Sequence, residues 1–269
     1  MVGTALTRSP DVMKISFTGS TVVGKSIARD SVDLMKRVML ELGGKSANII
    51  LDDADLSKAI PFALMAAFMN NGQACIAGTR LLVPENRLEE IKAALKKAVS
   101  ALKVGNPANS DTTIGPLVFE KQWNRVQGYI KKGIDEGAEV LIGGLGRPQG
   151  LEAGYFIKPT VFVNVKSDMT IAKEEIFGPV FSVLTYKTEE EAIEIANSTA
   201  YGLMGYVSSS NQEHGKRGAE QIEAGTVMIN DFHYEPNAPF GGVKQSGVGR
   251  ELGVYGIESY LEPKAVAGR

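Results

Sequence analysis

The chain alternates short apolar runs with amphipathic segments over its whole length, and this alternation limits its possible folds most strongly. Apolar runs bounded by Gly, Pro or acidic residues predict buried strands, and the clearest lie at 37–42, 46–53 and 80–84. The stretch 85–105 carries apolar residues at three-to-four spacing and predicts an amphipathic helix. Strands that alternate with helices are typical of an α/β fold with a mainly parallel sheet.

Other segments follow the same alternation. A helix that starts near Asp55 contains Pro61, which either kinks it or marks a later start. A further helix is predicted from about 120 to 136, and a strand-like segment near the C-terminal end covers 258–266. The remaining predicted strands are 14–18, 138–144, 155–165, one within 174–186, 202–209 and 226–231.

Composition excludes several classes of protein. Hydrophobic residues make up 43% of the chain, charged residues 22%, and the net charge is -2. This balance lacks the excess of basic residues that binding to nucleic acid or to an anionic membrane requires. No apolar run is long enough to cross a bilayer. A single cysteine rules out an internal disulfide, which fits a reducing compartment. We therefore expect a cytoplasmic protein without a nucleic-acid or membrane partner.

The stretch GSTVVGKS, residues 19–26, fits the phosphate-binding P-loop pattern. It follows a predicted strand and opens a predicted helix, and the acids that end 46–53 could hold Mg²⁺. However, Val22 and Val23 resist the dihedral angles that such a loop needs. A nucleotide triphosphatase is therefore the weaker hypothesis, although a helix N-terminus can still bind a pyrophosphate.

Two residues are candidates for chemistry. Glu41 follows an apolar run and precedes two glycines, and Cys75 lies in the small-residue stretch NNGQACIAG. Taken alone, each fits a structural role: a surface carboxylate and a small buried thiol. Together they suggest a nucleophile with a carboxylate base for reaction at a carbonyl carbon. His214 and His233 lie in no recognisable Cys–His signature, and no metal-ligand cluster is evident, so we expect no metal.

Six stretches resemble the NAD(P)-dependent aldehyde dehydrogenase superfamily in order and spacing. They are KISFTGSTVVGK, LELGGKSANIIL, NNGQACIAGTRLLV, GYFIKPTVF, EEIFGPV and PFGGVKQSGVGRELG. The resemblance implies an aldehyde dehydrogenase-like α/β catalytic domain with a partial Rossmann-type cofactor domain. It also implies NAD or NADP as cofactor and a small-molecule aldehyde as substrate.

The resemblance assigns roles to ten residues. Cys75 would form a thiohemiacetal and then a thioester, which water activated by Glu41 would hydrolyse; the Cys75 backbone N–H would help to bind the oxyanion. The other implied residues are Gly19, Ser20, Leu42, Gly43, Glu175 and Phe177 for the cofactor, and Tyr234 and Phe240 for the substrate tunnel.

The resemblance covers only the C-terminal half of the family's usual length. We expect the C-terminal part of the cofactor domain at 1–43, the catalytic domain at 44–245, and a tail at 246–269 whose strand joins a partner's sheet. This implies a homo-oligomer, and a separate chain carrying the missing N-terminal half is a possible second partner. A catalytically silent fragment with a structural role is the alternative function, because the missing half normally completes the cofactor site and the oxyanion hole.

Overall fold

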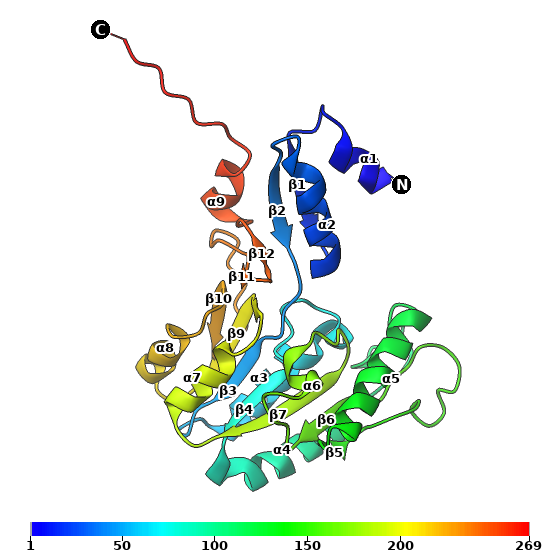
Figure 1. The fold of residues 1–269 in the computed structure, drawn as a ribbon. Coiled ribbons are helices and arrows are strands. Elements are labelled where there is room, and N and C mark those ends of the chain that lie inside the picture. Colours follow the sequence, from blue (N-terminus) through cyan, green and yellow to red (C-terminus); the bar gives the residue numbers. More distant parts are fainter. Residues whose placement is uncertain (1, 269) are drawn as a thin grey trace.

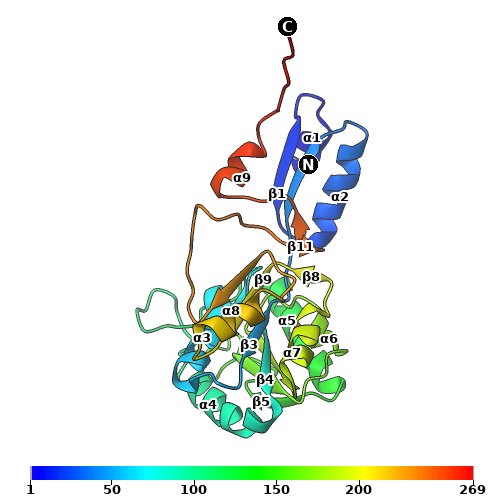
Figure 2. The ribbon, with the colours of Figure 1, turned by 90° about the vertical axis from the view of Figure 1, so that its left-hand side faces the viewer.

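The computed structural model describes residues 2–268 and contains two bodies stacked end to end (Figures 1 and 2). The larger body is built on a seven-stranded sheet in which only β5 runs antiparallel to its neighbour, so the predicted α/β class with a mainly parallel sheet is confirmed. In sheet order its strands are β10 (Thr226–Ile229), β9 (Met204–Ser208), β3 (Ala47–Ile50), β4 (Arg80–Pro84), β7 (Val180–Tyr186), β6 (Thr160–Val163) and β5 (Glu139–Ile142).

Helices cover both faces of this sheet. The alternation along β4 shows how: Leu81 and Val83 pack in the cluster under one set of helices, whereas Leu82 packs in the cluster on the opposite face. One face carries α3 (Leu56–Phe68) and α4 (Leu88–Ser100). The other carries α5 (Glu120–Asp135), α6 (Thr170–Lys173), α7 (Glu189–Asn197) and α8 (Gln212–Ala219).

The smaller body contains a three-stranded sheet. β1 (Lys14–Thr18) pairs in parallel with β2 (Arg37–Glu41), and the late strand β12 (Gly247–Val248) joins β2 antiparallel. The chain thus returns from the far end of the sequence to complete the sheet that it began. Around this sheet lie α1 (Val2–Arg8), α2 (Thr21–Val32) and α9 (Gly253–Glu258). The remaining short elements are the strands β8 (Tyr201–Gly202) and β11 (Val243–Lys244) and the 3₁₀ turns η1 (Met69–Gly72) and η2 (Glu85–Arg87).

Most predicted elements are present. The structure resolves the question about Pro61, because α3 runs unbroken from Leu56 to Phe68 with the proline inside it. α9 ends at Glu258, and residues 261–268 form no helix or strand. Among residues 2–268 no strand pairs with the segment 258–266, so the strand that would join a partner's sheet stays a prediction, as does the division at 43 and 245. Within the part of the chain described, no helix is long and apolar enough to span a membrane.

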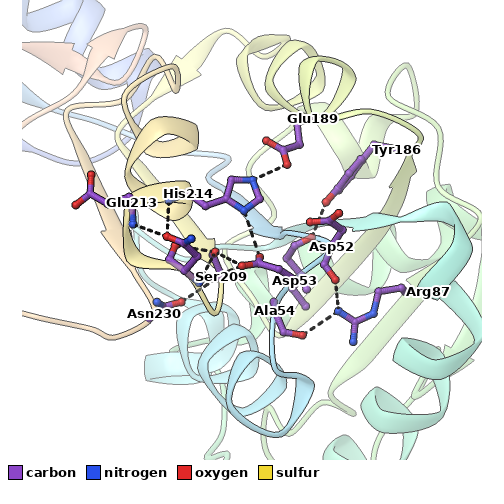
Figure 3. Close-up of polar contacts among 12 residues, drawn as sticks. Asp52, Asp53, Ala54, Arg87, Tyr186, Glu189, Ser209, Glu213, His214 and Asn230 are labelled. Carbon is purple, nitrogen blue, oxygen red and sulfur yellow. Dashed lines mark hydrogen bonds and ion pairs between the residues drawn. The ribbon is translucent and has the colours of Figure 1, made fainter.

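A polar network ties the larger body together at the carboxyl end of β3 (Figure 3). His214 of α8 places Nε2 2.6 Å from Glu189 Oε1 at the start of α7, and Nδ1 3.5 Å from Asp53 Oδ1. Ser209 Oγ donates to Asp53 Oδ2 at 2.8 Å. Asp52, Asp53 and His214 each place a ligand atom within 4.8 Å of the others. Because both ring nitrogens of His214 already face carboxylates, we read this group as an ion-pair network that holds α7 and α8 to the turn after β3.

Candidate active site

A cavity of about 1250 Å³ lies at the junction of the two bodies. The carboxyl ends of β1 and β2 approach it from the smaller body, and the segments that precede β3, β4 and β7 approach it from the larger one. Nine of the ten residues that the sequence singled out line this cavity, and Glu41 does not. The nine are Gly19, Ser20, Leu42, Gly43, Cys75, Glu175, Phe177, Tyr234 and Phe240.

Cys75 is presented by the turn between α3 and β4. Asn70 and Asn71 have positive φ angles of 49° and 58°, and Gly72 follows at 69°. Asn and Gly are the residues that adopt this left-handed region most readily. Asn71 Oδ1 accepts from the Gly115 N–H at 2.8 Å, and its Nδ2 donates to Pro116 O at 3.2 Å. The run Asn-Asn-Gly therefore ends the helix sharply and delivers Cys75 to the cavity.

Gly43 and Gly44 separate Cys75 from Glu175. A β-carbon on Gly44 would lie 2.3 Å from the carbonyl oxygen of Cys75, and one on Gly43 would lie 2.5 Å from Glu175 Oε2. The Gly44 N–H donates to Glu175 Oε1 at 3.1 Å. The two glycines are required because their backbone packs between the nucleophile and the carboxylate without space for side chains.

The surroundings of Cys75 disfavour its thiolate form. Burial raises the pKa of the Cys75 thiol, and the charge of Glu175 raises it further, with a smaller contribution from Glu41. The backbone N–H groups of Cys75 and Ile76 act in the opposite direction, because they stabilise charge on the sulfur. The same two N–H groups could stabilise negative charge on a substrate oxygen beside the sulfur.

Glu41 ends β2 and is buried, with a 2% exposed fraction. Neither carboxylate oxygen has a hydrogen-bond partner among residues 2–268. Burial and the charge of Glu251 raise the pKa of Glu41 to about 7, although Arg250 opposes this. A β-carbon on Gly241 would lie 2.6 Å from Oε1, so the carboxyl group packs against the late loop rather than facing the cavity. The sequence pattern did not predict this orientation of the Glu41 side chain.

The loop after β1 reaches the cavity through Gly19 and Ser20. Ser20 caps α2 by accepting from the Val23 N–H, and the Gly19 N–H donates to Glu41 O at 3.0 Å. Lys25 lies in the second turn of α2, where Nζ donates to Gln245 Oε1 at 3.0 Å, and it does not line the cavity. Asp52 and Asp53 follow β3, at the end of that strand away from Gly44, and they do not line the cavity that the N-terminus of α2 reaches. This arrangement does not support the P-loop hypothesis.

Two residues of α5 line the cavity and were not predicted. Arg125 donates to the carbonyl oxygen of Glu175 at 2.6 Å, and Gln122 Nε2 donates to that of Phe177 at 2.6 Å. Together they fix the segment that presents Phe177 with a positive φ of 62°. Their spacing of three residues in a predicted helix places them on one face. The buried position of Gln122, a polar residue on that face, depends on its partner segment and is not encoded locally.

The whole chain matches one family. The model of the aldehyde dehydrogenase family matches residues 1–266. The chain belongs to the aldehyde dehydrogenase family. It is 53% identical over 267 residues to a putative aldehyde dehydrogenase of Staphylococcus saprophyticus, covering 99% of this chain and 56% of the relative. The chain thus spans about half the length of the curated relatives it matches.

Solved structures of aldehyde dehydrogenases share the fold. Aldehyde dehydrogenase C of Pseudomonas syringae, in complex with NAD⁺ and octanal, matches with a TM-score of 0.97 and 48% identity over 98% of this chain and 55% of its own. An aldehyde dehydrogenase of Mycobacterium tuberculosis, in complex with NAD⁺, matches with a TM-score of 0.93 and 51% identity. The match covers 95% of this chain and 53% of that protein. A betaine aldehyde dehydrogenase of Staphylococcus aureus matches with a TM-score of 0.93 and 42% identity, and the match covers 96% of this chain and 52% of that protein.

Proposed function

We propose that this chain forms the catalytic part of an enzyme that oxidises an aldehyde to a carboxylic acid with NAD⁺ or NADP⁺. The observation that supports this most directly is the position of Cys75. The single cysteine of the chain lies on the cavity, separated by the Gly43–Gly44 backbone from a carboxylate that faces the same space. Sulfur is the strongest nucleophile among these cavity-lining groups once it is ionised.

In the proposed reaction the Cys75 thiolate attacks the aldehyde carbon and forms a thiohemiacetal. The thiol proton leaves to solvent or to a base, and the N–H groups of Cys75 and Ile76 stabilise the oxyanion. Loss of hydride from that carbon gives a thioester on Cys75. Water then attacks the thioester, and the acid leaves with regeneration of the thiol.

Glu41 is the proposed base for the water. A carboxyl group with a pKa of about 7 is well matched to proton transfer near neutral pH. Its oxygens hold no hydrogen bonds among the described residues, so turning the side chain toward Cys75 breaks none. The proposed mechanism requires this rotation because Glu41 does not line the cavity in the structure.

The cavity residues fit a nicotinamide dinucleotide, which supplies the hydride acceptor when bound. Gly19 and Ser20 place the N-terminus of α2 on the cavity, where backbone N–H groups favour a pyrophosphate. Glu175 would hold the nicotinamide ribose hydroxyls, and Phe177 would flank the ring. Leu42 and Gly43, which line the cavity, would lie beside it, and Tyr234 and Phe240 would line the path for the aldehyde.

The test follows NADH or NADPH absorbance with an aldehyde panel that includes octanal and betaine aldehyde. We expect product from the natural chain and none from Cys75→Ser. For Glu41→Gln we expect roughly one reduced cofactor per chain, followed by a thioester that intact mass spectrometry detects, because only hydrolysis is slowed. Lys121→Met, an exposed change on α5, is the control. Product from Cys75→Ser at the natural rate would refute the proposal.

The silent-fragment alternative rests on length, because the chain spans about half of its relatives. If no reduced cofactor forms even at high protein concentration, oxidation is rejected for this chain alone. Repeating the assay with a separately produced N-terminal half of the Staphylococcus saprophyticus relative then tests whether a second chain completes the site. Activity only in the mixture would support that partner, and activity in neither would support the silent fragment.

A further inference from the structure

Lys45 is a buried basic residue that the proposed mechanism does not use. Only 2% of it is exposed, and its Nζ has no hydrogen-bond partner within residues 2–268. It does not line the large cavity; it borders a separate space of about 10 Å³, near the minimum that holds one water molecule. The amine of Lys45 is therefore buried without a direct partner among the described residues.

The backbone of Lys45 is fixed by a second buried basic residue. Arg80 Nε donates to Lys45 O at 2.9 Å, and the other Arg80 nitrogens donate to Ile195 O and Ala196 O at 2.8 and 2.7 Å. The Arg80 guanidinium is therefore hydrogen-bonded to carbonyl groups, and as a cation it cannot pair with the Lys45 amine. An apolar side chain at Lys45 would break no hydrogen bond among the described residues, so Lys45→Met removes the charge of the amine without leaving a polar partner unpaired.

The groups whose charges act on Lys45 explain what the amine can do. Burial lowers the pKa of Lys45 to about 7, and the neighbouring Arg80 lowers it too, whereas Glu175 and Glu174 raise it. Glu175 in turn is held by the Gly44 N–H, with Arg125 and Lys45 as its cationic neighbours. Lys45 thus follows directly in the chain the glycine that hydrogen-bonds Glu175, and its charge acts on the same carboxylate.

We propose that Lys45 is a positioning residue of this active site: its buried amine keeps the Glu175 carboxylate ionised and held against the Gly43–Gly44 backbone. Glu175 is the partner through which Lys45 acts, because the Gly44 N–H directly before Lys45 donates to Glu175 Oε1 at 3.1 Å, and Glu175 lines the cavity together with Cys75. This inference deepens the proposed function, since the cofactor role of Glu175 belongs to that proposal. The effect on Cys75, however, can be measured without cofactor or aldehyde.

The single cysteine provides the readout. The rate of Cys75 alkylation by iodoacetamide, followed by intact mass against pH, reports the thiolate fraction. Glu175→Gln removes the charge that disfavours the thiolate, so we expect faster alkylation from about pH 6 to about pH 8, by roughly three- to tenfold. Lys45→Met makes Glu175 easier to protonate, so we expect a similar increase at about pH 6. This increase should disappear above about pH 8, where Lys45 of the natural chain is itself neutral.

The double variant separates this role from direct or structural effects. In the Glu175→Gln background, Lys45→Met should change the rate by less than about twofold. Lys45→Gln is a second neutral variant, Lys121→Met is the matched control on an exposed lysine, and circular dichroism checks that both Lys45 variants remain folded.

The proposal would be overturned by an equal effect of Lys45→Met in both backgrounds, by no effect of Glu175→Gln, by slower alkylation of Lys45→Met, or by loss of folding in both Lys45 variants. If Cys75 of the natural chain is unreactive at every pH, the proposed function fails together with this inference. A reactive Cys75 with no Lys45 effect rejects the inference alone.

Discussion

At the scale of single residues, the site depends as much on two glycines, which have no side chain, as on Cys75 and Glu175. Gly43 and Gly44 let two backbone segments meet between Cys75 and Glu175, which any β-carbon would prevent. The sequence indicated Cys75, Glu41 and the glycines from local pattern. It could not indicate the direction of Glu41, because that depends on Gly241 and Arg250, about two hundred residues further along the chain.

We expect Gly44→Ala to lower the free energy of unfolding by about 1–3 kcal/mol, because its methyl group would lie 2.3 Å from the rigid carbonyl of Cys75. Urea titration measures this. Gly128→Ala in α5 is the matched control, since nothing lies within 4 Å of the added carbon and alanine favours helix. A Gly44→Ala protein as stable as the control would show that the backbone can separate at no cost.

Glu41 should make stability depend on pH. Its folded pKa of about 7 lies above the usual 4.5, so between these values the folded chain holds a proton that the unfolded chain has released. Stability contributed by this proton is present at low pH and lost as pH rises through 7. Glu41→Gln removes the titration. The free energy of unfolding of Glu41→Gln, relative to that of the natural chain, should therefore be higher by about 1–3 kcal/mol at about pH 8 than at about pH 5, as measured by thermal unfolding. Equal differences at the two pH values would contradict this reading.

At the scale of elements, the long strands and helices follow from periodicity, and the short ones do not. The buried strands β3, β4 and β7 and the helix α4 lie where the apolar patterns predicted them. The two-residue strands β11 and β12 carry no local signal, because each exists only through its pairing with a distant strand. The turn η1 is the element that matters most for the site, since its left-handed residues set where Cys75 emerges.

We expect Asn71→Ala to destabilise the chain by about 2–3 kcal/mol, because it removes two hydrogen bonds and keeps a β-carbon at a φ of 58° without the amide group that makes Asn tolerant of this region. Asn71→Gly loses the same bonds but tolerates the dihedral angle, so its loss should be smaller by about 1 kcal/mol. Chemical unfolding of both variants provides the comparison. Equal losses would mean that the backbone conformation carries no cost.

At the scale of the whole molecule, the two bodies differ in how well they cover their apolar residues. Large apolar side chains stand exposed on the smaller body and its tail, among them Met35 (87%), Val32 (65%) and Ile257 (68%). β1 is also an edge strand of the small sheet, with one side unpaired. Exposed apolar groups beside an unpaired parallel strand favour association with another chain.

We therefore expect the apparent mass to rise with concentration in size-exclusion chromatography with light scattering. The double change Val32→Lys and Met35→Lys should weaken this association, because it places charges on the exposed surface of the smaller body. Val118→Lys, an equally exposed position on the larger body, is the control. A strict monomer at every concentration would contradict both this expectation and the predicted homo-oligomer.

Ser246 joins three segments that are far apart in the sequence. Its hydroxyl donates to Gly43 O at 2.7 Å and accepts from the Gly202 N–H at 2.9 Å, while its carbonyl accepts from the Leu42 N–H. Leu42 and Gly43 therefore stay without these partners during synthesis until residue 246, about two hundred residues later in the sequence, has left the ribosome.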